Sequence, residues 1–239
     1  MSRYSTLYKI TLLFTILAFF SPVLKCPAEE GAPKNDEQRS LEKIFSFYGK
    51  LSSLSFDFSQ QTETTARTRS GSGDAVFFRP ARQSGGLMRW NYDSPDRQVV
   101  INDGGHISIY TESDQQMIIT PASELESDIT YQLLNGNTKI INDFNMVIFE
   151  PSSISSDNQP YPSIELTPLT PQNQLKTIRF WYDDKNIIHQ IVITDHFETI
   201  TTLRFSNIKI NELQANDPAA LSTILNFTPP PGTEIIRHQ

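Results

Sequence analysis

Apolar residues between positions 36 and 51 recur at intervals of three and four, which is the spacing of one face of an α-helix. Asn35 or Asp36 is suited to cap the start of this helix, and Glu37 and Glu42 favour its positive N-terminal end. The sequence therefore predicts an amphipathic helix with one apolar stripe, formed by Leu41, Ile44, Phe45, Tyr48 and Leu51.

From position 55 the apolar period shortens to two. Phe56 and Phe58 alternate with Asp57 and Ser59, as expected for a strand with one buried face. An Asn-Asp-Gly-Gly segment at 102–105 favours a tight hairpin, because such turns need positive φ angles. Beyond this first strand, we predict strands in the first half of the chain at 75–78, 87–92, 98–102, 106–110 and 116–120.

A second helix is predicted over residues 123–134. Ser123 suits its first position and Gly136 suits its end, since glycine readily adopts the backbone that terminates a helix. Its apolar stripe consists of Leu125, Ile129 and Leu133. A short third helix is predicted over residues 217–225.

The second half of the chain repeats the strand pattern. Strands greatly outnumber helices and mostly follow one another directly, which favours antiparallel pairing over βαβ units. We therefore expect a mainly β fold with one large antiparallel sheet that is curved or barrel-like. The further strands are predicted at 144–149, 163–167, 175–182, 187–194 and 198–210.

Charge and composition exclude several classes of function. The chain has 20 Lys and Arg against 27 Asp and Glu, a net charge of −7. Without a basic block we expect no nucleic-acid binding, because phosphate contacts need clustered cations. One cysteine permits neither an intrachain disulfide nor a cysteine-based zinc site.

Catalytic signatures are also absent from the sequence. None of the four histidines lies four residues from another with a glutamate between them, and no phosphate-binding loop or dinucleotide motif occurs. His189 and His196 could share a metal with Asp195, but the sequence favours ordinary polar residues on a sheet face. No serine or cysteine sits in a recognisable nucleophile motif. We therefore expect a binding protein without cofactor, metal or enzymatic activity.

The N-terminal segment has the layout of a secretory signal. Arg3 and Lys9 precede eleven uncharged residues at 10–20, a run well short of the roughly 20 residues that span a bilayer. We predict a cleavable signal peptide over residues 1–28 and a single domain over residues 29–239. Acylation of Cys26 is the alternative, although Lys25 argues against it because that position is normally small.

Short motifs in a fixed order run through most of the predicted mature chain. With this order and the leader, the chain resembles the periplasmic outer-membrane lipoprotein carrier proteins of the LolA type. The motifs are Phe58-x-Gln60, Phe78-Arg79-Pro80, Met88-Arg89-Trp90-x-Tyr92-x-x-Pro95, Val99-Val100-Ile101-x-Asp103-Gly104, Tyr110, Gln115-Gln116, Ile187-x-His189-Gln190 and Phe227-Thr228-Pro229-Pro230-x-Gly232.

The resemblance implies an unclosed antiparallel β half-barrel capped by a helical lid. It also implies a periplasmic chaperone that shields triacylated lipoproteins. Such a chaperone receives them from an inner-membrane ABC-type release complex and delivers them to an outer-membrane receptor. We accordingly expect a periplasmic monomer.

A carrier of this kind needs an apolar interior, which alternate side chains of curved strands can supply. The candidate acyl-chain cavity consists of Phe56, Phe58, Met88, Trp90, Ile101, Ile107, Ile109, Met117 and Ile119. The stripes of the first two helices would close it as a lid: Leu41, Ile44, Phe45, Tyr48, Leu51, Leu125, Ile129 and Leu133. Plain core packing stays open as the alternative role of these residues.

The family holds its lid closed with the help of an arginine in an Arg-Pro element, which maps to Arg79. Between Pro80 and Met88 this chain carries a longer segment than is usual in the family, and that segment contains Arg82. The resemblance therefore implies Arg79 as the lid latch, with Arg82 as the alternative.

Three other functions stay open. The same half-barrel could carry a different lipid or a glycolipid, which would need the same apolar groove. An acylated Cys26 would instead make the chain a membrane-anchored receptor or sensor that binds lipoproteins. An exported hydrolase is the third alternative, although no motif in the sequence supports it.

Overall fold

The computed structural model describes residues 36–80, 86–153, 160–172, 174–214 and 218–238. The predicted signal peptide, Cys26 and the alternative latch Arg82 lie outside these residues. So does Asn35, one of the two predicted helix caps. Within the described ranges, no helix is long and apolar enough to cross a membrane.

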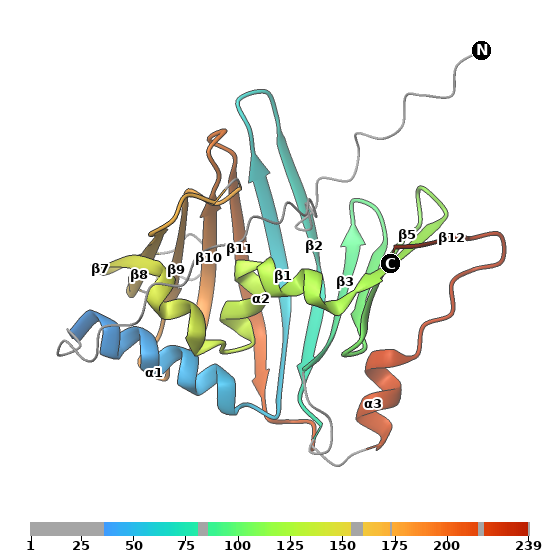
Figure 1. Ribbon diagram of the computed structural model, residues 1–239, viewed down its shortest axis with the longest axis horizontal. Coiled ribbons are helices and arrows are strands. Elements are labelled where there is room, and N and C mark those ends of the chain that lie inside the picture. The colour runs from blue at the N-terminus through green and yellow to red at the C-terminus, as the bar shows by residue number, and fades with distance from the viewer. Residues whose placement is uncertain (1–35, 81–85, 154–159, 173, 215–217, 239) are drawn as a thin grey trace.

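Twelve strands form one curved sheet in the order β12-β6-β5-β4-β3-β2-β1-β11-β10-β9-β8-β7 (Figure 1). Neighbouring strands are antiparallel except β12 and β6, which are parallel. In the described part of the chain the edge strands β7 and β12 do not pair, so the sheet is open, which confirms the predicted half-barrel. The strands are β1 (Ser53–Glu63), β2 (Thr68–Phe78), β3 (Leu87–Ser94), β4 (Gln98–Asn102), β5 (His106–Thr111), β6 (Gln116–Pro121), β7 (Phe144–Ser153), β8 (Pro160–Pro168), β9 (Thr177–Tyr182), β10 (Ile188–Thr194), β11 (Ile200–Ile210) and β12 (Glu234–Arg237).

Each predicted strand overlaps an observed one, but β1 and β2 are longer than expected. Their pairing continues from Gln60 opposite Gly71 to Glu63 opposite Thr68. Backbone hydrogen bonds need no apolar side chain, so the ladder extends past the point where the hydrophobic alternation ends. The long β1–β2 hairpin is the tallest part of the sheet in Figure 1.

Helical segments cover the concave side of the sheet (Figure 1). Helix α1 (Asp36–Lys50) begins at one of the two predicted cap positions. Its whole predicted stripe is buried, from Leu41 to Leu51. The helix therefore forms because an amphipathic face packs against the sheet, as the period predicts.

The prediction of one continuous helix over 123–134 is wrong. A 3-10 segment, η1 (Ala122–Ser127), and a short helix, α2 (Ile129–Leu134), are separated by Asp128 in an extended conformation. Asp128 caps α2 by accepting a hydrogen bond from the Tyr131 backbone N–H, so Ser123 does not start this helix. Aspartate favours such a cap over a helix interior, and the chain is interrupted there for that reason.

The convex side of the sheet carries the C-terminal part of the chain. Helix α3 (Pro218–Leu225) packs on Phe78 and Leu87 through Ala220 and Ile224. Strand β12, which the sequence pattern did not predict, adds to β6 at the edge. It is only four residues long and mostly exposed, and it lacks the alternation that marks a longer strand.

Candidate functional site

An aromatic cluster fills the middle of the concave face. Phe56 and Phe58 of β1 lie beside Trp90 of β3, with ring centroids 5.6 and 4.7 Å from the indole. Phe205 of β11 lies 4.6 Å from Phe56, and Tyr92 lies 4.9 Å from Phe58. These rings alternate along their strands, so one strand face supplies a continuous apolar wall.

Six of the nine predicted cavity residues belong to this buried cluster, and three do not. Phe56, Phe58, Met88, Trp90, Ile107 and Ile109 lie in the main core under the helices. Ile101 and Met117 instead pack with Tyr110 and Phe227 on the convex side. Ile119 shares that side, because it is two residues beyond Met117 on the same strand.

The placement of Ile101, Met117 and Ile119 in the cavity is therefore corrected. On β4 the inward residue is Val100, and on β6 the residue opposite Ile109 is Ile118. Both strands are apolar on two sides because helix α3 and the C-terminal segment cover the convex side there. Without alternation between apolar and polar residues, the sequence could not show which residues point inward.

The lid is the set of helical segments α1, η1, α2 and η2 (Thr138–Asp143), which meet the aromatic wall directly. Leu125 and Leu133 are buried against it, and Ile129 is half-buried at its margin. The Tyr131 ring of α2 lies 6.3 Å from the Phe77 ring of β2. All eight predicted lid residues thus contact the core; whether they form a movable lid stays a prediction.

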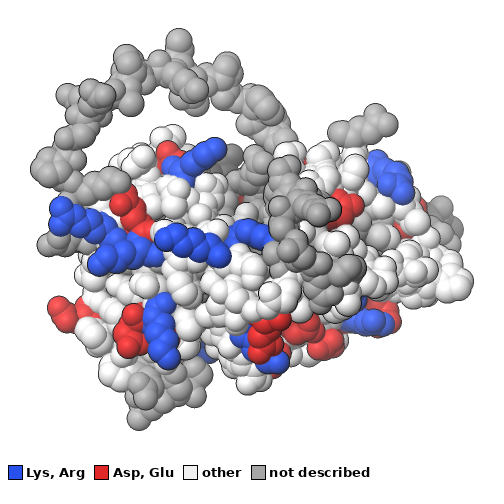
Figure 2. All heavy atoms as spheres, turned by 90° about the horizontal axis from the view of Figure 1, so that it is seen from below, with Lys and Arg blue, Asp and Glu red and all other residues white. Residues whose placement is uncertain are grey.

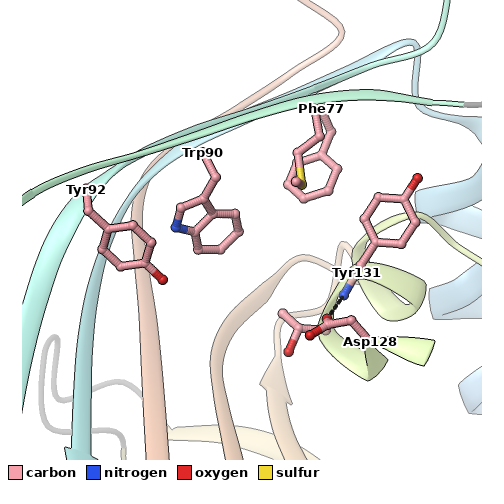
Figure 3. A pocket seen from close by; sticks show the side chains of 7 residues that line it. Phe77, Trp90, Tyr92, Asp128 and Tyr131 are labelled. Carbon is pink, nitrogen blue, oxygen red and sulfur yellow. Dashed lines mark hydrogen bonds between the residues drawn. The ribbon is translucent and has the colours of Figure 1, made fainter. Parts of the chain in front are cut away.

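A small cavity remains between α2 and the wall (Figure 3). Its space for a water-sized molecule is about 10 Å³, enough for roughly one water. An acyl chain therefore fits inside only if the lid moves. The lining residues are Phe77, Met88, Trp90, Tyr92, Asp128, Thr130 and Tyr131.

The Arg79 side chain connects the C-terminal ends of α1 and α2. Its Nη1 donates to the carbonyl oxygens of Tyr48 and Leu51, at 2.9 and 2.6 Å. Its Nη2 donates to the carbonyl oxygen and to Oδ1 of Asn135, at 2.6 and 2.9 Å. Carbonyls at helix ends lack intrahelical partners and attract positive charge, so one guanidinium satisfies both ends. Burial lowers the pKa of Arg79, with a smaller opposing effect of Tyr131.

The same two helix ends approach each other through glycines. Gly136 follows Asn135 with φ of +65°. A Cβ atom on Gly136 would lie 2.1 Å from the backbone nitrogen of Gly49 and 2.6 Å from its Cα. Only glycine at position 136 permits this contact, which brings Asn135 within reach of Arg79.

Two further hydrogen bonds tie the helices to the sheet. The Tyr48 hydroxyl of α1 accepts from the backbone N–H of Ile188 on β10, at 2.8 Å. The Asn102 amide of β4 donates to the Tyr131 hydroxyl of α2, at 3.2 Å. Together with Arg79, these side chains fix both lid helices over the wall.

The cavity also holds a carboxyl group. Asp128 Oδ1 accepts from the Tyr131 backbone N–H at 2.7 Å. Desolvation by burial raises the pKa of Asp128 to about 6, although hydrogen bonds from the Tyr131 and Thr130 backbones oppose this rise. Figure 3 shows the carboxyl at the base of α2, across the cavity from Trp90 and Tyr92.

The outside of helix α1 carries charged side chains. Arg39, Lys43 and Lys50 are exposed on α1, opposite its buried stripe. Figure 2, which views the molecule from below, shows Lys and Arg side chains grouped on the side of this face where α1 lies. Helix α1 also contains Asp36, Glu37 and Glu42, so its net charge is zero.

The sequence pattern identifies Arg79 but not Asn135, Asn102 or Asp128. Asn135 precedes a glycine at a helix end, a pattern that signals termination but no contact with an arginine 56 residues away. Asn102 belongs to the hairpin signal at 102–105, which predicts a turn but no contact with Tyr131. Asp128 was placed inside a helix. Only tertiary structure brings these three residues to the lid.

The arrangement is suited to binding an apolar ligand. Among the described residues, no group of three His, Cys, Asp or Glu side chains could hold a metal ion. The interior polar groups are few and sit between apolar surfaces. An apolar wall beneath a hydrogen-bonded lid is suited to shielding hydrocarbon from water.

Comparison with known proteins gives consistent matches. The family model for the "Outer membrane lipoprotein carrier protein LolA" matches residues 49–217, a segment that contains β1 to β11, α2 and Arg79. An outer-membrane lipoprotein carrier protein of Nitrosomonas europaea is 26% identical over 228 residues, covering 95% of this chain and 100% of the relative. A protein of the same name from Dechloromonas aromatica is 23% identical over 199 residues, covering 82% of this chain and 87% of the relative.

Among solved structures, an uncharacterized conserved protein from Thermus thermophilus superposes with a TM-score of 0.53. It is 9% identical and covers 83% of this chain and 99% of its own. At such low identity the match supports the fold and nothing more specific.

Proposed function

This chain belongs to the family of outer membrane lipoprotein carrier proteins, and on that premise we propose that it carries acylated lipoproteins through the periplasm. Its cargo is triacylated lipoprotein, received from an inner-membrane ABC-type release complex and delivered to an outer-membrane receptor. The protein acts as a non-enzymatic chaperone, exported by a signal peptide over residues 1–28.

One observation carries this proposal: the apolar wall is closed by helices that are held through hydrogen bonds at their ends. An acyl chain of about 16 carbons gains roughly 12 kcal/mol on leaving water, at about 0.8 kcal/mol per methylene. To keep the chain out of the membrane, a carrier must provide most of this free energy by burying the chain against its own apolar surface. The concave cluster around Phe56, Phe58 and Trp90 supplies such a surface.

Closure of the lid competes with cargo binding and so favours release. When no ligand is bound, Leu125, Leu133 and the α1 stripe cover the wall that an acyl chain would occupy. Binding must therefore displace lid contacts, which lowers the net affinity. The latch formed by Arg79 adds to this effect, since charge-assisted hydrogen bonds contribute about 1.5–3 kcal/mol each.

The proposal is tested with protein purified from its own periplasm. Native mass spectrometry should show a lipoprotein bound, and a version of that lipoprotein without acyl groups should not bind. An added fraction of outer membrane should then remove the acylated cargo.

Other outcomes would replace the proposal. A bound glycolipid or other lipid, with no lipoprotein, would support the alternative cargo. A mature chain heavier by acyl groups on Cys26 would support the anchored receptor or sensor. Hydrolysis of the acyl esters would make the protein an enzyme.

A further inference from the structure

Two buried polar groups beside the cavity have no hydrogen-bond partner. They are Oγ1 of Thr130 on α2 and Nε1 of Trp90 on β3, which lies near the Tyr92 hydroxyl without forming a well-aligned hydrogen bond to it. Trp90 is 5% exposed and Thr130 is 1% exposed, so both are shielded from bulk solvent. Buried polar groups are nearly always paired, and an unpaired one at a binding site indicates a partner missing from this state.

The two groups lie on opposite sides of the contact between the lid and the aromatic wall. Trp90 belongs to the wall and Thr130 to the lid, and both line the cavity. Figure 3 shows the indole of Trp90 facing this space from the wall, with Asp128 on the lid side. When α2 moves away, both groups become accessible to whatever enters.

The chemistry of these groups restricts the ligand. An indole N–H only donates hydrogen bonds, and a threonine hydroxyl donates readily, so the missing partner is an acceptor. The carboxyl of Asp128 lines the same cavity, and an ionised Asp128 would repel a carboxylate or phosphate. The acceptor is therefore uncharged, and the neighbouring Phe77 and Met88 fit the hydrocarbon attached to it.

We propose that Trp90 and Thr130 form a polar subsite that binds the carbonyl oxygen of an acyl ester or amide. This inference rests on the proposed function, since it places the head of an acyl chain at one end of the apolar wall. The subsite would position the chain, while its affinity comes from the apolar surface.

A pair of neutral lipids tests the subsite directly. Monopalmitoylglycerol and hexadecylglycerol differ only in having an ester or an ether at the head of the chain. The wild-type protein should bind the ester about three- to tenfold more tightly, the effect of one or two neutral hydrogen bonds. Palmitate at about pH 8 should bind more weakly than the ester, because of Asp128.

Two substitutions should remove the preference. Thr130→Val replaces the hydroxyl by a methyl group of the same shape, and Trp90→Phe removes the N–H. Thr130→Val should keep or raise the melting temperature while losing the preference for ester, because it removes an unpaired buried group. A residue with only a structural role would not produce this combination.

Gln190→Met provides the matched control. Gln190 Oε1 is also buried without a partner, but it lies on the convex side, opposite Arg204. Its substitution should leave both lipids unaffected. If the wild type binds ester and ether equally, or if Thr130→Val keeps the full preference, the subsite is wrong and acyl binding stands. If the wild type binds neither lipid, the proposed function itself fails.

Discussion

Arg79 is the residue at which the sheet and both lid helices meet. Its four hydrogen bonds end on Tyr48 of α1, on Leu51 directly after that helix, and on Asn135. We predict that Arg79→Leu leaves a folded protein that loads lipoprotein but transfers it poorly. Loss of these bonds weakens the closed lid by about 2–4 kcal/mol, so less free energy favours release. Transfer to outer membranes should fall about tenfold or more, with loading unchanged or stronger.

Arg89 offers a matched control for this substitution. Its Nη1 donates to the Thr223 and Asn226 carbonyl oxygens at the end of α3, on the convex side. Arg89→Leu therefore breaks a similar contact away from the lid and should not affect transfer. Normal transfer by Arg79→Leu, combined with a defect in Arg82→Leu, would move the latch to Arg82.

Asp128 should make lid closure depend on pH. Its pKa is raised to about 6 in the closed state by burial, and in an open lid it returns toward its ordinary, lower value. The closed state therefore binds the proton more tightly. Closure is strongest at low pH, weakens as pH rises through about 6, and changes little above that.

A binding titration at two pH values tests this. Acyl ligand needs the open lid, so wild type should bind it up to about tenfold more weakly at about pH 5 than at about pH 7.5. Asp128→Asn can still cap α2 but cannot ionise, so its affinity should be nearly independent of pH. An unchanged pH dependence in Asp128→Asn would show that another group is responsible.

At the scale of secondary-structure elements, the junction of α1 and α2 depends on Gly136. We predict that Gly136→Ala opens the lid, because its Cβ would overlap the Gly49 backbone. Gly232→Ala is the control: it also has a positive φ, of +90°, but nothing within 4 Å. Both variants carry backbone strain of about 1–2 kcal/mol, and only Gly136→Ala adds overpacking of about 1–3 kcal/mol.

Hydrogen exchange by mass spectrometry measures the difference between these variants. Gly136→Ala should increase exchange in α1 and α2, whereas Gly232→Ala should affect only the C-terminal segment. If the two variants behaved alike, strain at φ and not the helix junction would explain the effect.

Elements whose hydrophobic period is clear were predictable from the sequence. The stripe from Leu41 to Leu51 gave α1, and the alternation at Phe56 and Phe58 gave β1. Asp128 interrupts the predicted helix because it caps α2, and the spacing of apolar residues does not show this interruption. Strand β12 was missed because its stability comes from pairing with β6 and not from its own pattern.

The candidate site was predictable where one strand face is apolar. Trp90 and Phe58 could be placed inside, whereas Ile101 and Met117 could not, since their strands are covered on both sides. The contacts of Arg79 join three segments that meet only in the folded chain. Motif order pointed to Arg79, while its acceptors Leu51 and Asn135 required the structure.

At the scale of the whole molecule, the space between the lid and the aromatic wall is almost filled. The cavity beneath the lid has a volume of about 10 Å³. Pockets that bury a drug-sized ligand are on the order of 300–1,000 Å³. The sheet is held by long strand ladders, including the full length of β1 between β2 and β11. The lid is held by a few side chains, so space for cargo should arise by moving the lid.

Hydrogen exchange of the whole protein should therefore separate into two responses when acyl cargo binds. Amides of α1, η1 and α2 should exchange faster, because cargo replaces their contacts with the wall. Amides of β1, β2 and β11 should stay protected, because their ladder does not change. The expected contrast is at least about tenfold in the lid, following the loss of contacts worth more than about 1.4 kcal/mol. Uniform protection of lid and sheet on cargo binding would mean that the chain holds acyl groups outside the half-barrel.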